Sequence, residues 1–266
     1  MRGLLGISGA VIIALLVLVA ALASLIAPYD PADIDLEGEL EPPSGDHPLG
    51  QDRLGRDILS RLIHGARVSI LVGLVVTGIS VAFGVLMGSL AGFAGGAIDN
   101  LIMRIVDVLL ALPGILLAIA ITGVLGPSLF NVILALSVLG WVGFARLVRG
   151  QILSIREREF VLAARAVGAG PLRVIVRHLL PNVMGPVIVQ ATFGMAGVIL
   201  AEASLSFLGL GPQDVPTWGA MLNEGADYLL FAPHLATYPG LAIMLTVLGF
   251  NFLGDGLRDR LDPKNR

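Results

Sequence analysis

Few residues in this 266-residue chain have the types and spacing that catalysis or metal binding requires. The absence of cysteine excludes disulfides, thiolate chemistry and cysteine-based metal sites. The four histidines are widely spaced, which argues against a zinc cluster. The stretch DIDLEG (33–38) is similar to the start of an EF-hand loop, but the twelfth position, where that loop needs a bidentate glutamate, is Ser44. We therefore expect no metal site and interpret these acids as a solvated surface.

Motifs for nucleotide binding and for the common hydrolases are missing as well. A P-loop requires G-x-x-x-x-G-K-[ST], but the only lysine is Lys264, and Asn265 follows it. The chain contains neither a G-x-S-x-G elbow nor an H-E-x-x-H pair. We therefore expect no catalytic residue and no cofactor-binding residue, and predict that the chain is not an enzyme. If it transports actively, the energy comes from another subunit or from an ion gradient.

Three ionisable residues in apolar surroundings are weak candidates for a transport pathway or a structural role. Arg104 and Asp107 are spaced i, i+3, so they can neutralise each other on one helix face. This favours a structural pair over an ion or proton path. Glu202 lies near the end of another apolar segment, where we expect its carboxylate to reach water.

The composition predicts an all-α integral membrane protein. Hydrophobic residues make up 56% of the chain, charged residues only 14%, and the mean hydropathy is +0.88. Soluble domains carry about 25% charged residues. Such a chain cannot cover its surface with polar groups, so a lipid environment is indicated.

Six segments have the length of a membrane-spanning helix, which is about 20 apolar residues. The stretch GPS (126–128) divides a long uncharged run into two of them, and Pro113 is expected to kink one. The first apolar segment is longer than a signal-peptide core, so a retained helix is favoured over a cleaved signal. Frequent glycine and alanine favour close packing into a bundle. The expected spans are 4–26, 68–94, 101–124, 129–149, 183–205 and 236–256.

The distribution of positive charge predicts the orientation. With both termini inside, thirteen of the 17 Lys and Arg residues fall on the inner side and four on the outer side. This agrees with the positive-inside rule, and the opposite orientation would invert the ratio. Both termini and the segment 150–182 are therefore expected in the cytoplasm.

The expected organisation follows from these spans. An amphipathic helix starting at Asp52 is expected at the outer interface before the second span. The second outer loop could cap the pore mouth or receive a soluble partner, and the simpler alternative is an interfacial helix anchored by Trp218 and Tyr228. The predicted parts are a first transmembrane helix (1–27), an extracytoplasmic loop with an interfacial helix (28–67), a five-helix core (68–257) that includes a cytoplasmic coupling loop (156–182) and an outer loop (206–235), and a cytoplasmic tail (258–266).

The inner segment EREFVLAARAVGAGPLRVIVRHLLPN (157–182) predicts a helix, a glycine turn and a second helix. Gly168 and Gly170 end the first helix, Pro171 starts the second, and Pro181 is expected to stop it. Apolar faces are expected from Phe160, Val161, Ala164 and Val167 on the first helix and from Leu172, Ile175, Val176 and Leu179 on the second.

Two uses of such a helix-turn-helix are considered: DNA binding and mechanical coupling to a partner protein. A DNA reader needs its own small core, and about 30 residues tethered to spans at both ends leave no material for one, so we expect no nucleic-acid partner. The second use is mechanical, because an amphipathic helix can insert its apolar face into a groove on a partner. A moving partner would then displace the two spans that the segment joins.

The segment resembles the coupling loop of bacterial ABC importer permeases, whose pattern is E-A-A-x-x-x-G, nine residues, then I-x-L-P. Matches are Ala163, Ala164, Gly168, Leu180 and Pro181, whereas Leu162 replaces the Glu and His178 replaces the Ile. Seven ordered blocks extend the resemblance to the peptide/nickel class, specifically the C-type permease of dipeptide and oligopeptide importers. The blocks are HPLGQDRLGRDILSRLIHGARVS (47–69), MRIVDVLLALP (103–113), RLVRGQILSIREREFVLAARAVGA (146–169), RHLLPN (177–182), AEASLSFLGLG (201–211), PTWGAML (216–222) and GDGLRDRLDP (254–263).

The resemblance implies a type I ABC importer permease in the bacterial inner membrane, in contact with membrane lipid. A second, homologous permease would complete the pathway, two ATPase subunits or domains would bind ATP and Mg²⁺, and an extracytoplasmic binding protein would deliver di- or oligopeptides. Alternatives are an importer for nickel or another small solute such as glutathione, and an ion-coupled secondary transporter. The expected ATPase-coupling residues are Glu159, Phe160, Val161, Ala163, Ala164, Arg165, Gly168, Leu180 and Pro181.

Overall fold

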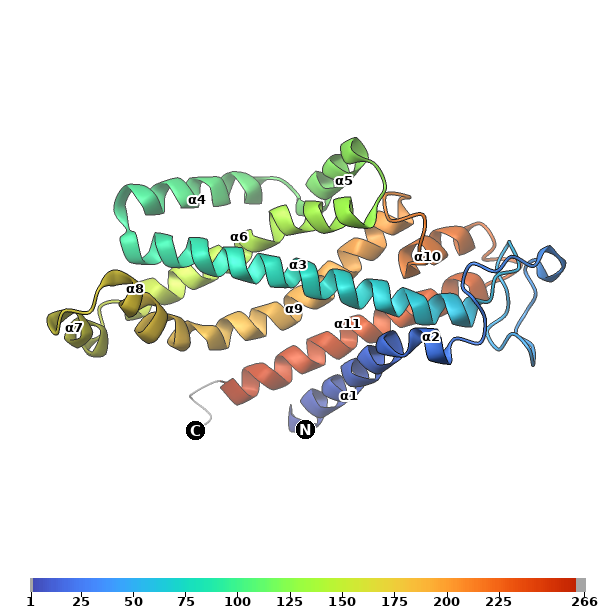
Figure 1. Ribbon diagram of the computed structural model, residues 1–266, viewed down its shortest axis with the longest axis horizontal. Coiled ribbons are helices and arrows are strands. Elements are labelled where there is room, and N and C mark those ends of the chain that lie inside the picture. Colours follow the sequence, from blue (N-terminus) through green and yellow to red (C-terminus); the bar gives the residue numbers. More distant parts are fainter. Residues whose placement is uncertain (1, 262–266) are drawn as a thin grey trace.

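The computed structural model describes residues 2–261 as an elongated helical bundle (Figure 1). Apart from an isolated bridge between Gln51 and Asp57, the regular structure of these residues is helical. The elements are α1 (Arg2–Ala21), α2 (Ala23–Ile26), η1 (Leu36–Gly38), α3 (Ile58–Ala94), α4 (Gly96–Ala111), α5 (Gly114–Leu125), α6 (Leu129–Ile155), α7 (Glu159–Ala166), α8 (Pro171–Val174), the π-helical η2 (Ile175–Leu179), α9 (Leu180–Phe207), α10 (Trp218–Ala226) and α11 (His234–Leu261).

Four helical stretches in the described range are long and apolar enough to cross a membrane: α3, α6, α11 and the run Pro171–Phe207. The pair α4–α5 also qualifies if its two halves form one span, although they meet at 85°. The apolar part of α1, Leu5–Ala21, is shorter than the expected span 4–26. The turn expected at GPS (126–128) is present, because α5 ends at Leu125 and Ser128 caps α6.

The expected span 101–124 is broken rather than kinked. Leu112 has an extended backbone (φ −96°, ψ 139°), and α5 starts directly after Pro113. A proline disfavours helical geometry in the residue before it and removes one helix hydrogen bond, so the chain turns at this dipeptide. As a result, α4 runs beside α3, whereas α5 points away from α3 (Figure 1).

Helices α3 and α6 pack closely through a stripe of small residues. Gly84, Gly88 and Gly92 recur every four residues on α3 and therefore share one face. A Cβ atom on Gly88 would lie 2.5 Å from the carbonyl oxygen of Ala145 and 2.8 Å from the Cβ of Val148. Membrane helices gain packing when small residues allow their backbones to approach, and this pair forms the centre of the bundle.

A second close contact joins the two ends of the chain. A Cβ atom on Gly6 of α1 would lie 2.8 Å from the Cα of Gly256 on α11. One turn along, a Cβ on Gly9 would lie 2.7 Å from the carbonyl oxygen of Gly249. Helix α1 is therefore packed into the bundle along α11 instead of standing apart from it (Figure 1).

The outer interfacial helix expected before the second span is not separate. Residues 52–57 form a loop, and residues 58–67 are the first turns of the uninterrupted 37-residue helix α3. Asp57 caps this helix, because its Oδ2 accepts a hydrogen bond from the Ser60 backbone N–H at 2.7 Å. No residue between 58 and 94 breaks the helix, so the interfacial part and the span are continuous.

An ion-pair network ties the loop before α3 to α10. Arg61 bonds both Asp52 and Glu224, with its Nη1 at 2.7 Å from Glu224 Oε2. Arg56 donates to the same two carboxylates, at 2.7 Å to Asp52 Oδ2 and 2.8 Å to Glu224 Oε2. Burial alone would raise the pKa of the Glu224 carboxyl, but the hydrogen bond from Arg61 and the charges of Arg61 and Arg56 outweigh it, so this pKa is lowered.

Of the two aromatic side chains considered as anchors for the outer loop, Trp218 lies inside the protein. Trp218 is 1% exposed and donates its Nε1–H to the carbonyl of Leu62 at 3.0 Å. Gly65 on α3 leaves room for the Trp218 indole ring, because a Cβ atom at this position would lie 2.7 Å from the ring. Tyr228 is partly buried against the same apolar core. The prediction of an interfacial belt was therefore wrong for Trp218, which fastens α10 to α3.

The two ends of the bundle differ. The N-terminal end of α1 and the C-terminal end of α11 lie toward the end that carries α7 and α8 (Figure 1). Helix α10 and the long connection between α2 and α3 lie at the opposite end (Figure 1). The segment predicted to couple to a partner is therefore well separated from the ion-pair network.

Candidate functional site

Helices α7 and α8 form a compact helix-turn-helix at one end of the bundle (Figure 1). Gly168 adopts φ +86°, and its N–H donates to the Arg165 carbonyl at 2.9 Å. The N–H of Ala169 donates to the Ala164 carbonyl at 3.0 Å, so the turn provides donors for carbonyls at the end of α7. Pro171 occupies the first turn of α8. The glycine turn and the helix start expected from the sequence are therefore confirmed.

One face of this segment is anchored in the protein. Val161, Val174 and Leu179 are fully buried, and Ala164 is 8% exposed. The three fully buried side chains join an apolar cluster with residues of α6 and α9, among them Ile152. Val161, predicted as a contact for another chain, is therefore part of the anchor. Leu180 packs at the edge of the same cluster.

The other face presents large apolar side chains that nothing in the described chain covers. Phe160 and Leu162 on α7 are 40% and 50% exposed. Val167 is 86% exposed and Leu172 is 74% exposed. The predicted faces are thus only partly right, because Phe160, Val167, Leu172 and Val176 point away from the core. The remaining predicted coupling residues at the surface are Glu159, Ala163, Arg165, Gly168 and Pro181.

Pro181 does not stop the second helix, contrary to the expectation. The chain passes from α8 through η2, a π-helical segment, into α9, and the run Pro171–Phe207 is one continuous helical stretch. Pro181 lies in the first turn of α9 and has no backbone N–H to donate to the preceding turn. The π-helical turn η2 accommodates this missing hydrogen bond. Helix α8 is therefore continuous with α9.

Arg165 makes a contact that the sequence did not indicate. Its guanidinium carbon lies 5.1 Å from the ring centroid of Phe93, near the end of α3, in cation–π geometry. This contact links α7 to α3, in addition to the covalent links from α7 to α6 and from α8 to α9. The two residues are far apart in the sequence, so no local pattern marks the pair.

Ion pairs fasten α4 to α6 near the same end. Arg149 donates to both carboxylate oxygens of Asp99, at 2.5 and 2.7 Å. Asp107 accepts from Arg146 at 2.6 Å, so the predicted Arg104–Asp107 pair was wrong. Two residues of neighbouring helices face each other here, whereas Arg104 is exposed and, within residues 2–261, has no ion-pair partner. Asp107 is therefore a structural link.

Glu202 is buried, contrary to the expectation that it reaches water. Its side chain on α9 is 0% exposed. One carboxylate oxygen accepts from the Ser206 hydroxyl at 2.7 Å, and the other has no partner in the described structure. The neighbouring Ala203 and Leu205 pack into two different apolar clusters, which explains the burial. Elsewhere, no group of three or more His, Asp or Glu residues within 2–261 could hold a metal ion.

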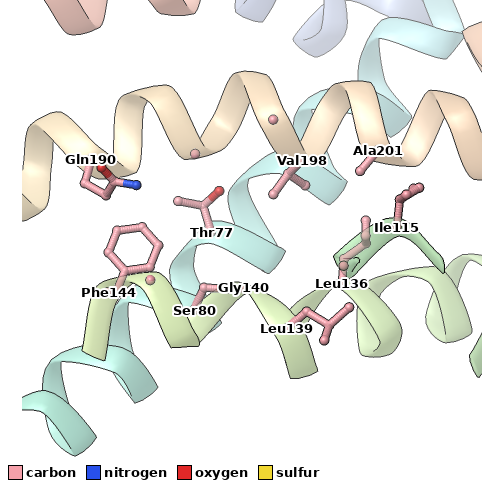
Figure 2. Close-up of a pocket in the computed structure, with 14 residues that line it drawn as sticks. Thr77, Ser80, Ile115, Leu136, Leu139, Gly140, Phe144, Gln190, Val198 and Ala201 are labelled. Atoms are coloured by element: carbon pink, nitrogen blue, oxygen red, sulfur yellow. The ribbon is translucent and has the colours of Figure 1, made fainter. Parts of the chain in front are cut away.

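A cavity of about 280 Å³ lies among α3, α5, α6 and α9 (Figure 2). Thr77 and Ser80 line it from α3, and Gln190 lines it from α9. Ile115 of α5 and Leu136 of α6 form part of its apolar wall (Figure 2). The lining residues come from four helices and are mostly small, so no spacing in the sequence marks them as a group.

Comparisons with known proteins match this architecture. Residues 84–266 match the family described as the binding-protein-dependent transport system inner membrane component. Residues 5–43 match the N-terminal transmembrane domain of oligopeptide transport permease C. The chain belongs to this family of inner-membrane transport permeases. The resemblance to permeases of the peptide class is thereby confirmed, as is the expectation of a multi-pass inner-membrane protein.

Related permeases cover nearly the whole chain. A dipeptide transport permease (DppC) of Alkalihalophilus pseudofirmus is 46% identical over 98% of this chain and 86% of that protein. A glutathione transport permease (GsiD) of Escherichia coli O157:H7 is 48% identical over the same two shares. An oligopeptide transport permease (OppC) of Bacillus subtilis is 42% identical, again over 98% and 86%.

The fold matches a solved ABC importer. An inward-facing crystal form of the MetNI methionine ABC transporter superposes with a TM-score of 0.63 at 20% identity. The match covers 76% of this chain and 96% of that one. The expected type I ABC importer permease fold is therefore confirmed.

Proposed function

We propose that this permease imports di- or oligopeptides, and that ATPase subunits drive it through α7 and α8. The observation that carries the proposal is the pair of opposed faces on this segment. Val161 and Val174 are fixed in a cluster with α6 and α9, while Phe160, Val167 and Leu172 are exposed on the other side. An exposed apolar face on a rigidly anchored helix pair fits a groove on a moving partner.

The names of the relatives support a peptide as the cargo. The dipeptide, glutathione and oligopeptide permeases each match over 98% of this chain. Glutathione is itself a tripeptide, so these three cargoes share peptide bonds. Nickel or another small solute remains the alternative within the class, and an ion-coupled carrier is the alternative outside it. Uptake that requires ATP hydrolysis by a partner subunit would reject the ion-coupled alternative.

The proposed assembly contains several chains. A second, homologous permease completes the pathway, two ATPase subunits or domains bind ATP and Mg²⁺, and an extracytoplasmic binding protein delivers cargo. In this assembly α7, α8 and both termini face the cytoplasm. Two features support the orientation. One is the arginine-rich distribution that favours an inner location for 150–182, and the other is that the N-terminal end of α1 and the C-terminal end of α11 both point toward the α7–α8 side (Figure 1).

A pair of proline substitutions tests the coupling role. Gly168 (φ +86°) and Gly126 (φ +90°) are both open to solvent or lipid, and each donates its N–H to a helix carbonyl. Proline at either position removes that donor and forces a negative φ. We expect Gly168→Pro to abolish ATP-driven uptake of a labelled dipeptide, because it distorts α7. Gly126→Pro, at the other end of the bundle, should retain most of the uptake.

The measurement uses proteoliposomes that contain the permease purified with its partner subunits, with membrane insertion of each variant checked first. Normal uptake by Gly168→Pro would refute the coupling role. An equal loss in both variants would refute it too, since the defect would then follow from proline strain at any such turn.

A further inference from the structure

We propose that the cavity among α3, α5, α6 and α9 is a peptide-binding subsite, which holds one peptide unit of the cargo during its passage. The ligand class is a neutral peptide group with a small or apolar side chain. This inference rests on the proposed peptide-import function. It assigns to the cavity the residues that hydrogen-bond the cargo, chiefly Thr77, Ser80 and Gln190.

The first argument is that two buried hydroxyls in the cavity wall lack partners. Thr77 is 7% exposed and Ser80 is 2% exposed, and neither hydroxyl has a hydrogen-bond partner in the described structure. Buried polar groups are normally paired, and an orphaned hydroxyl in a membrane helix is unfavourable. Both residues line the cavity (Figure 2), so a molecule within it can supply the missing bonds.

Hydroxyls on α5, α9 and α11 have local partners, whereas on α3 Ser69 and Ser89, which do not line the cavity, are unpaired like Thr77 and Ser80. Thr122, Thr192, Ser204 and Thr246 each donate to the backbone carbonyl four residues earlier, at 2.7 to 3.0 Å. This local bond is the ordinary solution for Ser and Thr in a membrane helix. The hydroxyls of Thr77 and Ser80 do not adopt it, which leaves them available to a ligand.

The second argument comes from Gln190 on α9. Its side chain is exposed in this chain and makes no hydrogen bond within residues 2–261. A carboxamide offers both an acceptor and a donor, which is the complement of a peptide C=O and N–H. In Figure 2, Gln190 and Thr77 lie toward one side of the cavity, and Leu136, Leu139 and Ile115 lie toward the other.

The third argument is the absence of charge. None of the fourteen lining residues is ionisable. The cavity therefore has no counter-ion for the ammonium or carboxylate of a peptide terminus, nor for a metal ion. Its polar groups match a neutral amide, and its apolar wall matches a small hydrocarbon side chain. A neutral site of this kind accepts many peptide sequences, because it recognises the backbone they share.

Glycines create the space. Five of the fourteen lining residues are glycine. A Cβ on Gly114, Gly143 or Gly197 would meet no neighbour within 4 Å, whereas one on Gly140 would overlap the Ser80 hydroxyl. The volume of about 280 Å³ is near the lower limit of ordinary small-molecule sites, so the cavity holds part of a peptide.

Substitutions in the cavity wall test the proposal in the intact complex. In proteoliposomes with saturating binding protein, Gln190→Leu, Thr77→Val and Ser80→Ala should each slow uptake of tetraalanine, whose internal peptide units are neutral, about fivefold, the factor expected for one lost hydrogen bond. ATP hydrolysis should change much less. The matched control is Ser89→Ala, since Ser89 is also a buried, unpartnered serine on α3 but does not line the cavity. Equal effects of Ser80→Ala and Ser89→Ala, or unchanged uptake in all three cavity variants, would overturn the proposal.

Thiol protection provides a binding readout that does not depend on transport. The chain has no cysteine, so Gln190→Cys carries its only thiol. We expect saturating tetraalanine to slow alkylation of this thiol about fivefold or more in the complex, with no effect on Leu101→Cys, which is exposed on α4 away from the cavity. Alkylation that responds to added phospholipid and not to tetraalanine would identify a lipid occupant and reject the subsite. Absence of uptake of both dialanine and tetraalanine by the unmodified complex would reject the peptide-import function, while protection would still decide what the cavity binds.

Discussion

At the scale of single residues, charge pairs fix the two ends of the bundle. Glu224 accepts from Arg61 and Arg56, and these arginines also hold Asp52, so α10 is tied to the loop before α3. Asp99 and Arg149 form a bidentate ion pair near the other end. Removal of one partner from such a pair strongly destabilises the fold, because a partly buried charge is left without compensation.

The Glu224 pair predicts a specific pH dependence. The pKa of this carboxyl is lowered in the folded protein relative to 4.5, so its stabilising effect is complete above that value and is lost as the pH falls through the folded pKa. We expect Glu224→Gln to lower the unfolding free energy by about 2 kcal/mol at neutral pH and to have less effect in acid. Thermal unfolding of the detergent-solubilised protein between pH 3 and 7 measures this.

The control for that titration is Glu39→Gln, because Glu39 is an exposed acid at the same end of the bundle, in the connection between α2 and α3. This substitution should leave both the thermal unfolding midpoint and the pH dependence of that midpoint nearly unchanged. If Glu224→Gln destabilises the protein equally at all pH values, or matches Glu39→Gln, the ion-pair network does not hold α10.

At the scale of the elements, glycine and proline determine where helices touch and where they end. The α3–α6 contact depends on Gly84, Gly88 and Gly92, and the break between α4 and α5 depends on Pro113. Pro181 behaves differently because the preceding π-helical turn absorbs it. Pro113 therefore separates two helices because the residue before it leaves helical geometry, whereas Leu180 before Pro181 keeps it.

Two glycines of α3 give a direct test of the helix contact. A Cβ on Gly88 would crowd Ala145 and Val148, whereas one on Gly78 would meet nothing within 4 Å. We expect Gly88→Leu to destabilise the fold by about 1–3 kcal/mol or more, because it forces α3 from α6. Gly78→Leu should have little effect. Thermal midpoints of the two variants, measured in the same detergent, decide this, and equal midpoints would contradict the packing described.

Much of this element structure could be predicted from the sequence, and the remainder has physical reasons. Apolar run lengths placed the helices, and Gly168 and Pro171 marked the turn before α8. The partner of Asp107 was missed because Arg146 comes from another helix. Trp218 and Glu202 were placed at the surface because hydropathy carries no information on which side chains a folded loop covers.

At the scale of the whole molecule, the bundle connects two regions with different chemistry. One end carries the anchored α7–α8 segment with its exposed Phe160 and Leu172, and the interior carries the uncharged cavity beside Gln190. Helix α9 belongs to both, because it continues from α8 and also lines the cavity. Displacement of the segment by a partner would therefore act directly on a wall of the cavity. The sequence resemblance indicated the coupling role, but only the assembled helices bring the cavity residues together.

Site-specific cross-linking tests the central claim most directly. In the cysteine-free chain, Leu172→Cys places one thiol on the exposed face of α8, and Leu230→Cys places one in the connection between α10 and α11. The native side chains are 74% and 91% exposed. The account predicts that a short bifunctional reagent joins Leu172→Cys to the nucleotide-hydrolysing subunit of the assembled complex and does not join Leu230→Cys to it. An adduct from Leu230→Cys instead, or labelling of Leu172→Cys by a membrane-impermeant reagent applied from the outer side, would contradict the account.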